Sequence, residues 1–315
     1  MHRAAWKAVI EECFQHRAYY AYVERNGEIV GVLPLIHQKS RLFGSALISI
    51  PFGVYGGPLA LDTEALARLD AYAEELGERL GVDYIEYRSR TRAHPDWTSR
   101  GDLYYSFRRG IDEDLEANLK AIPRKQRAVV RQSLDRGLEA VVEGDPEDTF
   151  SVYAESVRNL GTPVFSKFYF AALKRHFGDD CEFLVVRKDG RPVSSVLSFY
   201  FRDEVLPYYG GGTIEARRTG ANDYMYWSLM NRAASSGSRV FDFGRSKKGT
   251  GAFAFKKNWC FTPEPLHYEY RLRALDSVPD VNPLNPKYRL MIAVWKRLPL
   301  AVANRIGPLV VRNLG

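Results

Sequence analysis

Cysteine is scarce in this sequence, with three in 315 residues. Cys13, Cys181 and Cys260 are odd in number, lie far apart and form no CxxC pair. This usage argues against a disulfide framework and against a zinc site, and it suits a reducing compartment. We expect no bound metal, and we expect each cysteine to be a small buried apolar residue rather than a nucleophile.

Long apolar segments are also missing. No stretch reaches the ~18 apolar residues of a membrane span. The first residues, MHRAAWKAVIEEC, contain neither an uninterrupted apolar run nor a small-residue cleavage site, so they do not resemble a signal peptide. We expect the protein to remain in the cytoplasm.

A covalent nucleophile is not evident either. No serine or cysteine lies in a nucleophile-elbow sequence, and no histidine partner for one is apparent. The sequence therefore does not predict catalysis through a covalent enzyme intermediate.

The composition is that of an ordinary globular protein with a basic surplus. Apolar residues make up 45% and charged residues 26% of the chain, and the formal net charge is +7. A positive excess favours anionic partners such as phosphates, nucleic acid, acidic lipid or acidic glycan, but it does not choose among them.

The most informative feature is an internal repeat. Residues 22–35 (YVERNGEIVGVLPL) and 185–198 (VVRKDGRPVSSVLS) are apolar runs interrupted by Asn-Gly and Asp-Gly. These dipeptides favour tight hairpins, because they tolerate positive φ. We therefore predict one β-hairpin in each copy.

The likeness continues downstream in the same order. Tyr55-Gly56-Gly57 matches Tyr209-Gly210-Gly211, and each is followed by a helical pattern, at 64–80 and at 222–235. Each helix is followed by a strand that carries an acid, Glu86 in IEYRS and Asp242 in FDFGRS. We predict an α/β protein made of two tandem copies of one mixed-sheet fold.

The repeat sets the expected domains. The first is 1–110, a helical connector follows at 111–139, the second is 140–275, and a basic helical tail spans 276–315. Pro123 should divide the connector into two short helices. The tail either lies on an anionic membrane surface or packs its apolar side on the second domain.

The stretch 208–261 is richest in groups that could carry chemistry. Gly210 and Gly211 either let a donor approach the strand backbone or form a flexible turn. Arg217, Gly220 and Asn222 open a helix, where a phosphate would be favoured, although Asn222 could simply cap that helix. Tyr209 lies beside the glycines, and we expect it among the catalytic groups.

Two further groups follow at the end of the second copy. Asp242 could accept a proton from an attacking amine, and Lys256 could stabilise negative charge on a tetrahedral intermediate. A structural ion pair between Asp242 and a nearby Arg or Lys explains the same pattern. For substrate binding we expect Arg245, Lys257, Tyr55 and Arg124.

These motifs resemble those of a known family. The segments FDFGRS (241–246) and GAFAFKKNWCF (251–261) resemble FemAB-like transferases, above all those associated with PEP-CTERM exosortase systems, which also have LPL and VYGG segments like 33–35 and 54–57. The segment 217–222 resembles the pyrophosphate loop of GNAT-type acyltransferases. The resemblance covers nearly the whole chain and implies a double GNAT-type fold in which Lys256 supports the transition state.

The resemblance also implies the reaction. Acyl-CoA, an acyl carrier protein or aminoacyl-tRNA would donate an acyl or aminoacyl group to an amine of a cell-envelope or exopolysaccharide precursor, a lipid-linked glycan included. The enzyme would work in the cytoplasm or at the inner face of the membrane. The alternatives are an inactive protein of this fold that binds an anionic glycan or lipid-linked precursor, and a nucleic-acid-binding protein, which ranks last because no RNA-reading motif is present.

Overall fold

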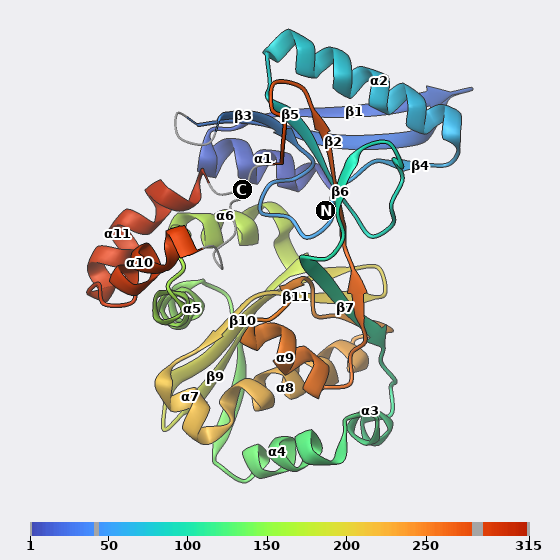
Figure 1. Cartoon of the computed structure of the whole chain (residues 1–315). Helices are drawn as coiled ribbons and strands as arrows, with labels where there is room; N and C mark the ends of the chain where they lie inside the picture. The colour runs from blue at the N-terminus through green and yellow to red at the C-terminus, as the bar shows by residue number, and fades with distance from the viewer. Residues whose placement is uncertain (1, 41–43, 279–285, 314–315) are drawn as a thin grey trace. The chain divides into compact units, whose positions relative to one another are not determined.

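The computed structural model describes residues 2–40, 44–278 and 286–313. The chain forms two compact units (Figure 1). Unit 1 comprises Met1–Tyr105, Pro265–Asn282 and Arg312–Gly315, and unit 2 comprises Ser106–Glu264 and Pro283–Val311. Each unit has its own mixed sheet, which confirms the fold class expected from the sequence.

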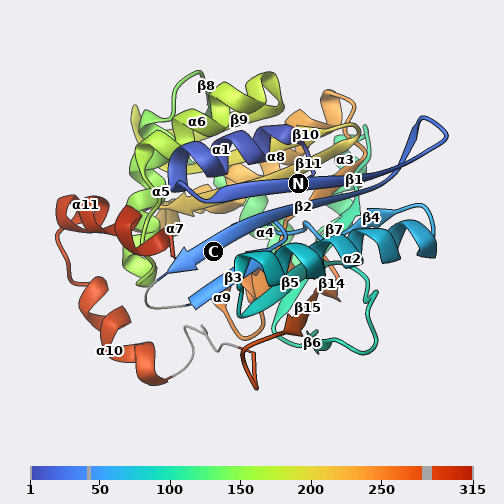
Figure 2. The same ribbon diagram turned by 90° about the horizontal axis from the view of Figure 1, so that it is seen from above.

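Unit 1 is built on a seven-stranded sheet with the strand order β1-β2-β3-β5-β15-β6, and β4 pairs with β2. Figures 1 and 2 show α1 and α2 on opposite faces of β1 and β2. The elements of the unit are α1 (Ala4–Phe14), β1 (Arg17–Arg25), β2 (Glu28–Ser40), β3 (Gly44–Ile48), β4 (Leu59–Ala60), α2 (Thr63–Leu80), β5 (Tyr84–Ser89), β6 (Thr98–Arg100) and β15 (His267–Leu272).

The helix α2 illustrates why the sequence folds as it does. Leu69, Ala73 and Leu76 recur at helical spacing and are fully buried against the sheet. The Asp62 side chain caps the start by accepting a hydrogen bond from the Ala65 N–H (2.9 Å). Gly81 ends the helix in the left-handed conformation, with φ 61°.

Unit 2 is built on an eight-stranded sheet with the order β13-β7-β12-β11-β10-β9-β8, and β14 pairs with β7. Its elements are β7 (Tyr104–Gly110), α3 (Leu115–Ala121), α4 (Arg124–Leu134), β8 (Leu138–Glu143), α5 (Glu147–Leu160), α6 (Lys167–Phe177), β9 (Cys181–Lys188), β10 (Arg191–Phe201), β11 (Glu204–Gly212), α7 (Ile214–Thr219), α8 (Ala221–Ser235), β12 (Val240–Asp242), β13 (Ser246–Lys247), α9 (Gly251–Asn258), β14 (Pro263–Pro265), α10 (Pro286–Trp295) and α11 (Leu300–Val311).

The predicted hairpins are present in both units. Antiparallel β1 and β2 are joined by Asn26-Gly27 (φ 54° and 82°), and antiparallel β9 and β10 by Asp189-Gly190 (φ 49° and 74°). Positive φ at both central residues gives the turn a twist that matches the flanking strands. The two predicted helices α2 and α8 and the two acidic strands β5 and β12 follow in the expected order.

The Tyr-Gly-Gly motifs, in contrast, are not equivalent. β3 and β11 occupy corresponding places, because each pairs antiparallel with the second hairpin strand and parallel with the acidic strand. Tyr209–Gly211 lies inside β11, whereas 55–57 lies in a loop that follows β3. The two glycine pairs therefore match in sequence but lie in different local structures.

In each unit, the strand next to the acidic strand comes from outside the repeated part of the sequence. β15 pairs with the acidic strand β5 in unit 1, and β7 pairs with the acidic strand β12 in unit 2. The chain therefore exchanges one strand between its two copies. The units differ for this reason from the continuous ranges 1–110 and 140–275 expected from the sequence.

The connector and the tail are helical. α3 and α4 flank Pro123, which confirms two short connector helices. In the tail, α10 and α11 lie within unit 2, and 279–285 and 314–315 lie outside the described residues. No helix in the described part of the chain combines the length and apolar character that a bilayer span requires.

The cysteines only partly match expectation. Cys181 is buried, Cys13 is half-buried and Cys260 is exposed. Cys260 follows α9 with φ 63°, at a left-handed position that usually holds glycine, and its side chain faces solvent there. The expectation of burial is wrong for this residue.

Candidate active site

The two central strands of unit 2 diverge. β11 pairs with β10 along its length, but its parallel partner β12 contacts it only through Glu204↔Val240 and Val205↔Phe241. Within the described residues no strand pairs with that edge of β11 from 206 to 212. After β12 the chain turns towards β7 instead, where the Phe243 N–H donates to the Phe107 carbonyl (2.8 Å). One backbone edge of β11 is thus left without a strand partner.

The three glycines at the end of β11 are required by packing. A Cβ on Gly210 would lie 2.8 Å from the Tyr226 hydroxyl on α8, and one on Gly211 would lie 2.6 Å from Ser156 Cβ on α5. A Cβ on Gly212 would overlap Asn222 Oδ1. Because neighbouring strand residues face opposite sides, α8 and α5 cover opposite faces of β11. The flexible-turn interpretation is therefore wrong.

The turn between α7 and α8 has the features of an anion site. Gly220 occupies it with φ 70°, and no side chain caps the N-terminus of α8. Arg217 and Arg218 are exposed in the last turn of α7. Uncapped N–H groups and adjacent guanidinium groups together favour a phosphate.

Asn222 does not cap this helix. It lies in the first turn of α8, and its Oδ1 accepts a hydrogen bond from the Ser194 hydroxyl (2.7 Å). The same hydroxyl lies 3.0 Å from the Gly211 carbonyl oxygen. Asn222 therefore fixes the turn to the end of β11, so the glycines and the candidate phosphate site form one assembly.

Lys256 binds the loop that follows β12. Its Nζ donates hydrogen bonds to the carbonyl oxygens of Phe243 (2.6 Å), Arg245 (3.1 Å) and Gly244 (3.3 Å). An ammonium has three N–H donors, and three carbonyls accept them. The amine thus fixes the path of the chain after β12. This path leads away from β11 and leaves its edge unpaired. The catalytic role that the family resemblance implies for Lys256 stays a prediction.

The side chain of Lys256 is buried. Burial lowers the pKa of Lys256 to about 7, the charge of Asp242 opposes this change, and Arg245 adds to it. Asp242 is buried, and its Oδ1 accepts a hydrogen bond from the Gly244 N–H (2.7 Å). Both side chains therefore stabilise the same loop, which brings the predicted acid and lysine to one part of the structure.

Tyr209 is not a solvent-facing catalytic group. Its side chain is buried, and its hydroxyl lies 3.0 Å from that of Tyr169 on α6. Burial raises the pKa of Tyr209 well above its ordinary value. It packs in an aromatic core with Tyr153, Phe165, Tyr169, Phe170 and Tyr208. The prediction of a catalytic Tyr209 is not supported by this placement.

Tyr226 stands instead where the strands diverge. Its hydroxyl approaches Gly210 of β11, and its ring packs at 4.9 Å edge-on against Phe243, which follows β12. Burial raises the pKa of Tyr226 to about 12, with a further contribution from Asp223, so the phenol is protonated at neutral pH. Sequence reasoning missed this residue, because only the fold brings it to Gly210.

Asp223 lies one turn earlier on the same face of α8. Its Oδ1 accepts hydrogen bonds from Trp259 Nε1 (3.1 Å) after α9 and from Gln126 Nε2 on α4. Burial raises the pKa of Asp223 to about 6, although both hydrogen bonds oppose the shift. A carboxylate that titrates near neutral pH can exchange protons during a reaction. This residue was also missed.

The predicted substrate-binding residues are divided between the two units. Arg245, Lys257 and Arg124 belong to unit 2, and the last two are exposed on α9 and α4. Tyr55 belongs to unit 1. Their roles stay predictions.

In unit 1 the corresponding divergence is closed by the chain itself. The loop 49–57 follows β3 and remains attached to β5. The Ser49 N–H donates to the Glu86 carbonyl (2.8 Å), and the N–H groups of Gly56 and Gly57 both donate to the Arg88 carbonyl (2.9 Å each). The end of β5 is therefore covered by backbone, unlike the edge of β11.

A buried ion pair completes this closure. Arg88 Nε donates to Glu86 Oε1 (2.6 Å), and both side chains are buried. Ile50 and Phe52 in the covering loop have φ of 57° and 65°, which is unfavourable for non-glycine residues and above all for β-branched ones. Glu86, the counterpart of Asp242, is thus enclosed in a structural pair.

The helix start of unit 1 is also unsuited to an anion. Asp62 caps α2, and Glu64 lies in its first turn. Arg25 pairs with both carboxylates (2.8 and 3.3 Å). The start of α2 already has these two carboxylates. The acid in the first turn of α8, Asp223, is bonded to Trp259 and Gln126, no side chain caps that helix, and two arginines lie beside it.

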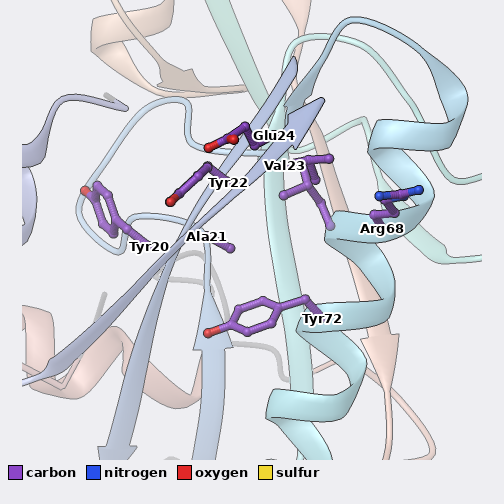
Figure 3. Close-up of a pocket in the computed structure, with 8 residues that line it drawn as sticks. Tyr20, Ala21, Tyr22, Val23, Glu24, Arg68 and Tyr72 are labelled. Atoms are coloured by element: carbon purple, nitrogen blue, oxygen red, sulfur yellow. The ribbon is translucent and has the colours of Figure 1, made fainter. Parts of the chain in front are cut away.

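Unit 1 contains a surface pocket of about 430 Å³ between β1 and α2. Arg68 and Tyr72 project from α2 towards β1, and five consecutive strand residues, 20–24, line the other wall (Figure 3). Because side chains alternate along a strand, a run of consecutive residues indicates that the strand edge itself forms this wall. None of the predicted catalytic or donor-binding residues lines the pocket.

Part of the sequence matches a known domain family, and the fold matches solved structures. Residues 124–257 match the family described as "Acetyltransferase (GNAT) domain". No curated protein matches the sequence.

Among solved structures, FemX superposes with a TM-score of 0.68 at 16% identity, over 92% of this chain and 94% of that one. A protein from Agrobacterium fabrum, described as the C-terminal domain of a lysylphosphatidylglycerol synthetase, gives 0.55 at 15% identity, over 85% and 88%. A tandem GNAT protein of the clavulanic acid biosynthesis pathway gives 0.54 at 13% identity, over 84% and 85%. At these identities the likeness is one of fold.

The family match lies in unit 2, on the strands and helices that form the diverging edge and the α7–α8 turn. Two mixed sheets of this design, the second carrying the matched domain, agree with the fold of the solved tandem GNAT protein. Residues 124–257 thus match the GNAT acetyltransferase domain family, and the chain as a whole has the fold of FemX and of a tandem GNAT protein.

Proposed function

We propose that unit 2 transfers an acyl or aminoacyl group from an activated thioester or ester to an amine of a cell-envelope or exopolysaccharide precursor. The divergence of β11 from β12 carries this proposal. It leaves main-chain groups beside Gly210 and Gly211 that can hydrogen-bond an extended donor and polarise its carbonyl. The closed counterpart in unit 1 supports unit 2 as the donor-binding copy.

The phosphate of the donor would lie at the α7–α8 turn. Arg217 and the N–H groups after Gly220 would bind it, and Asn222 would keep the turn aligned with β11. Acyl-CoA, acyl carrier protein and aminoacyl-tRNA all carry both phosphate and an activated carbonyl. The site therefore suits each of these donors, and the experiment below distinguishes them.

The chemistry would be a direct attack. The amine nitrogen forms a bond to the donor carbonyl carbon and loses a proton, and the C–S or C–O bond to the carrier breaks. The leaving sulfur or oxygen takes up a proton, which the protonated Tyr226 hydroxyl beside Gly210 is placed to donate. Asp223 or Asp242 would receive the amine proton, and Lys256 would hold the loop after β12.

The acceptor would be anionic, which suits the net charge of +7. Arg124, Arg245 and Lys257 are the groups of unit 2 that we propose to bind its charge. Tyr55 belongs to unit 1, and its part in acceptor binding stays a prediction. Two structural neighbours bear names that refer to Fem-type proteins and to a lipid synthetase, which supports an envelope precursor, such as a lipid-linked glycan, as the acceptor class.

A thermal-shift panel tests the proposal. Acetyl-CoA, longer acyl-CoAs, acyl carrier protein thioesters and charged tRNA are each added to the full chain. A donor at a hundredfold over its Kd should stabilise the protein by ~2.7 kcal/mol. Arg217→Ala should lose this shift, and Arg191→Ala, which removes an exposed arginine at the start of β10, should keep it.

The outcomes separate two functions. A shift that depends on Arg217, followed by amide formation with an amine acceptor, supports the transferase. The alternative is an inactive binding protein for an anionic glycan, which the full engagement of the Lys256 amine by three carbonyls favours. A shift with an anionic glycan, and with no donor in the panel, would establish that alternative and overturn the transferase.

A further inference from the structure

The last helix of unit 2 exposes an apolar stripe. Val302, Ile306 and Leu309 of α11 are all exposed, and Leu309 retains 66% of its accessible surface. Their spacing of four and three residues places them on one face of the helix. An exposed stripe of this kind is unusual on a soluble protein that has no partner there.

The opposite face of α11 fixes the direction of this stripe. Ala303, Gly307 and Val311 are buried. A Cβ on Gly307 would lie 2.7 Å from the Val164 carbonyl oxygen, so the helix packs against the chain that follows α5 without room for rotation. The stripe therefore points outwards as a consequence of packing within unit 2.

The preceding helix repeats the arrangement. Ile292 of α10 lies against Gly161 at the end of α5, where an added Cβ would be 2.5 Å from its Cγ2. Leu290, Met291 and Val294 lie on the other side of α10 and are exposed. Arg158 of α5 donates to the carbonyls of Lys296 and Leu298 (3.5 Å each), which holds the link between α10 and α11 in place.

The charge of this region has one sign. The last 35 residues, 281–315, contain six basic residues and no aspartate or glutamate. Lys296, Arg297 and Arg305 are exposed, and Arg305 lies next to the stripe on the helix surface. Outward apolar side chains flanked by cations are the pattern of an interfacial amphipathic helix.

We propose that the exposed apolar faces of α10 and α11, with Lys296, Arg297 and Arg305, bind the surface of a membrane that contains anionic lipid. A lipid surface fits better than a second copy of this chain, because a symmetric interface would place like charges opposite one another. The apolar side chains would enter the acyl boundary, and the cations would lie among the head groups. The proposal is independent of the transferase reaction.

Vesicle sedimentation of the full chain tests it. Vesicles of phosphatidylcholine mixed with phosphatidylglycerol should bind the protein, pure phosphatidylcholine should bind it far less, and salt should weaken the binding. The triple variant Val302→Ser, Ile306→Ser, Leu309→Ser should lose about tenfold or more in partition. Arg305→Gln should weaken binding to anionic vesicles alone.

Two controls keep the test decisive. The variant Ile29→Ser, Leu59→Ser, Leu61→Ser changes three similarly exposed apolar residues of unit 1 and should bind like the wild type. Circular dichroism verifies that both triple variants are folded. Equal binding by the α11 variant, or no binding to anionic vesicles, would overturn the proposal. Light scattering that shows a dimer lost in the α11 variant would instead make this face an interface between copies.

Discussion

At the scale of single residues, the hydroxyl of Tyr226 gives the most specific prediction about the transfer rate. Tyr226→Phe removes one oxygen and keeps the ring against Phe243. If the phenol donates a proton to the leaving group, the transfer rate should fall about a hundredfold or more. Tyr224→Phe on the same helix is the matched control. A rate unchanged in Tyr226→Phe, measured with the donor identified by thermal shift, would remove Tyr226 from the reaction.

Asp223 should make the free energy of unfolding depend on pH. Its folded pKa of about 6 lies above the ordinary 3.8, so the native state binds more protons between these values. Stability should therefore fall as pH rises from about 4 to about 6. The difference in unfolding free energy between wild type and Asp223→Asn, followed by urea denaturation across this range, should show that slope. A flat difference would mean that the carboxyl titrates at its ordinary pKa.

The candidate site could be predicted from the sequence only in part. Lys256 and Asp242 were found because they stand in a motif that resembles a family, and in the structure both side chains bond to the loop that follows β12. Tyr209 was chosen because it adjoins the glycines, but a strand turns adjacent side chains to opposite faces, and the side chain of Tyr209 is buried. Tyr226 lies 16 residues from Gly210, and no local pattern reveals that the fold joins them.

At the scale of elements, the contact between β11 and the α7–α8 turn should be intolerant of change. Gly212→Ala would place a methyl group on Asn222 Oδ1 and beside Ala216. We expect a loss of about 2 kcal/mol or more in unfolding free energy, together with a loss of donor binding. Gly144→Ala, where nothing lies within 4 Å of the added carbon, should be nearly neutral in both assays.

Elements with local causes were predictable. The hairpin turns follow from Asn-Gly and Asp-Gly, and the limits of α2 follow from Asp62 and Gly81. The pairing of strands was less predictable from the sequence. β11 meets β12 at only two positions, whereas a loop covers the end of β5. Both features depend on contacts between segments that are distant in the sequence. The same motif order therefore gave one open and one closed copy, which the sequence pattern did not distinguish.

At the scale of the whole molecule, the exchanged strands should prevent either copy from folding as a continuous segment. A fragment of residues 1–110 lacks β15, which covers β5 along 84–89. We expect this fragment to show no cooperative unfolding transition by circular dichroism, whereas the full chain should. A cooperative, native-like fragment would mean that β15 is dispensable for unit 1.

A half-buried histidine links α2 to the returning strand β15. His94 lies between Asp70 on α2 (3.0 Å) and Glu269 on β15 (3.4 Å). Burial lowers the pKa of His94, but its hydrogen bonds and the two carboxylate charges outweigh burial and raise it to about 9. This stabilisation is complete below pH ~6.5 and is lost as pH rises through about 9.

His94→Gln should therefore cost on the order of 2 kcal/mol at neutral pH, and less at pH 10. Urea denaturation at both pH values measures this difference. His176→Gln, on α6 of unit 2, is the control. An equal cost at both pH values would mean that His94 acts through its shape and not its charge.

The strand exchange has a consequence for synthesis. On the ribosome β1 to β5 emerge first, but β15 follows only after nearly all of unit 2 has been made. Until then the nascent chain presents the unpaired edge of β5, and unpaired edges invite aggregation. Production of this protein should accordingly depend on chaperones that hold the N-terminal half, and a ribosome that stops before residue 267 should release a chain that is marked for degradation.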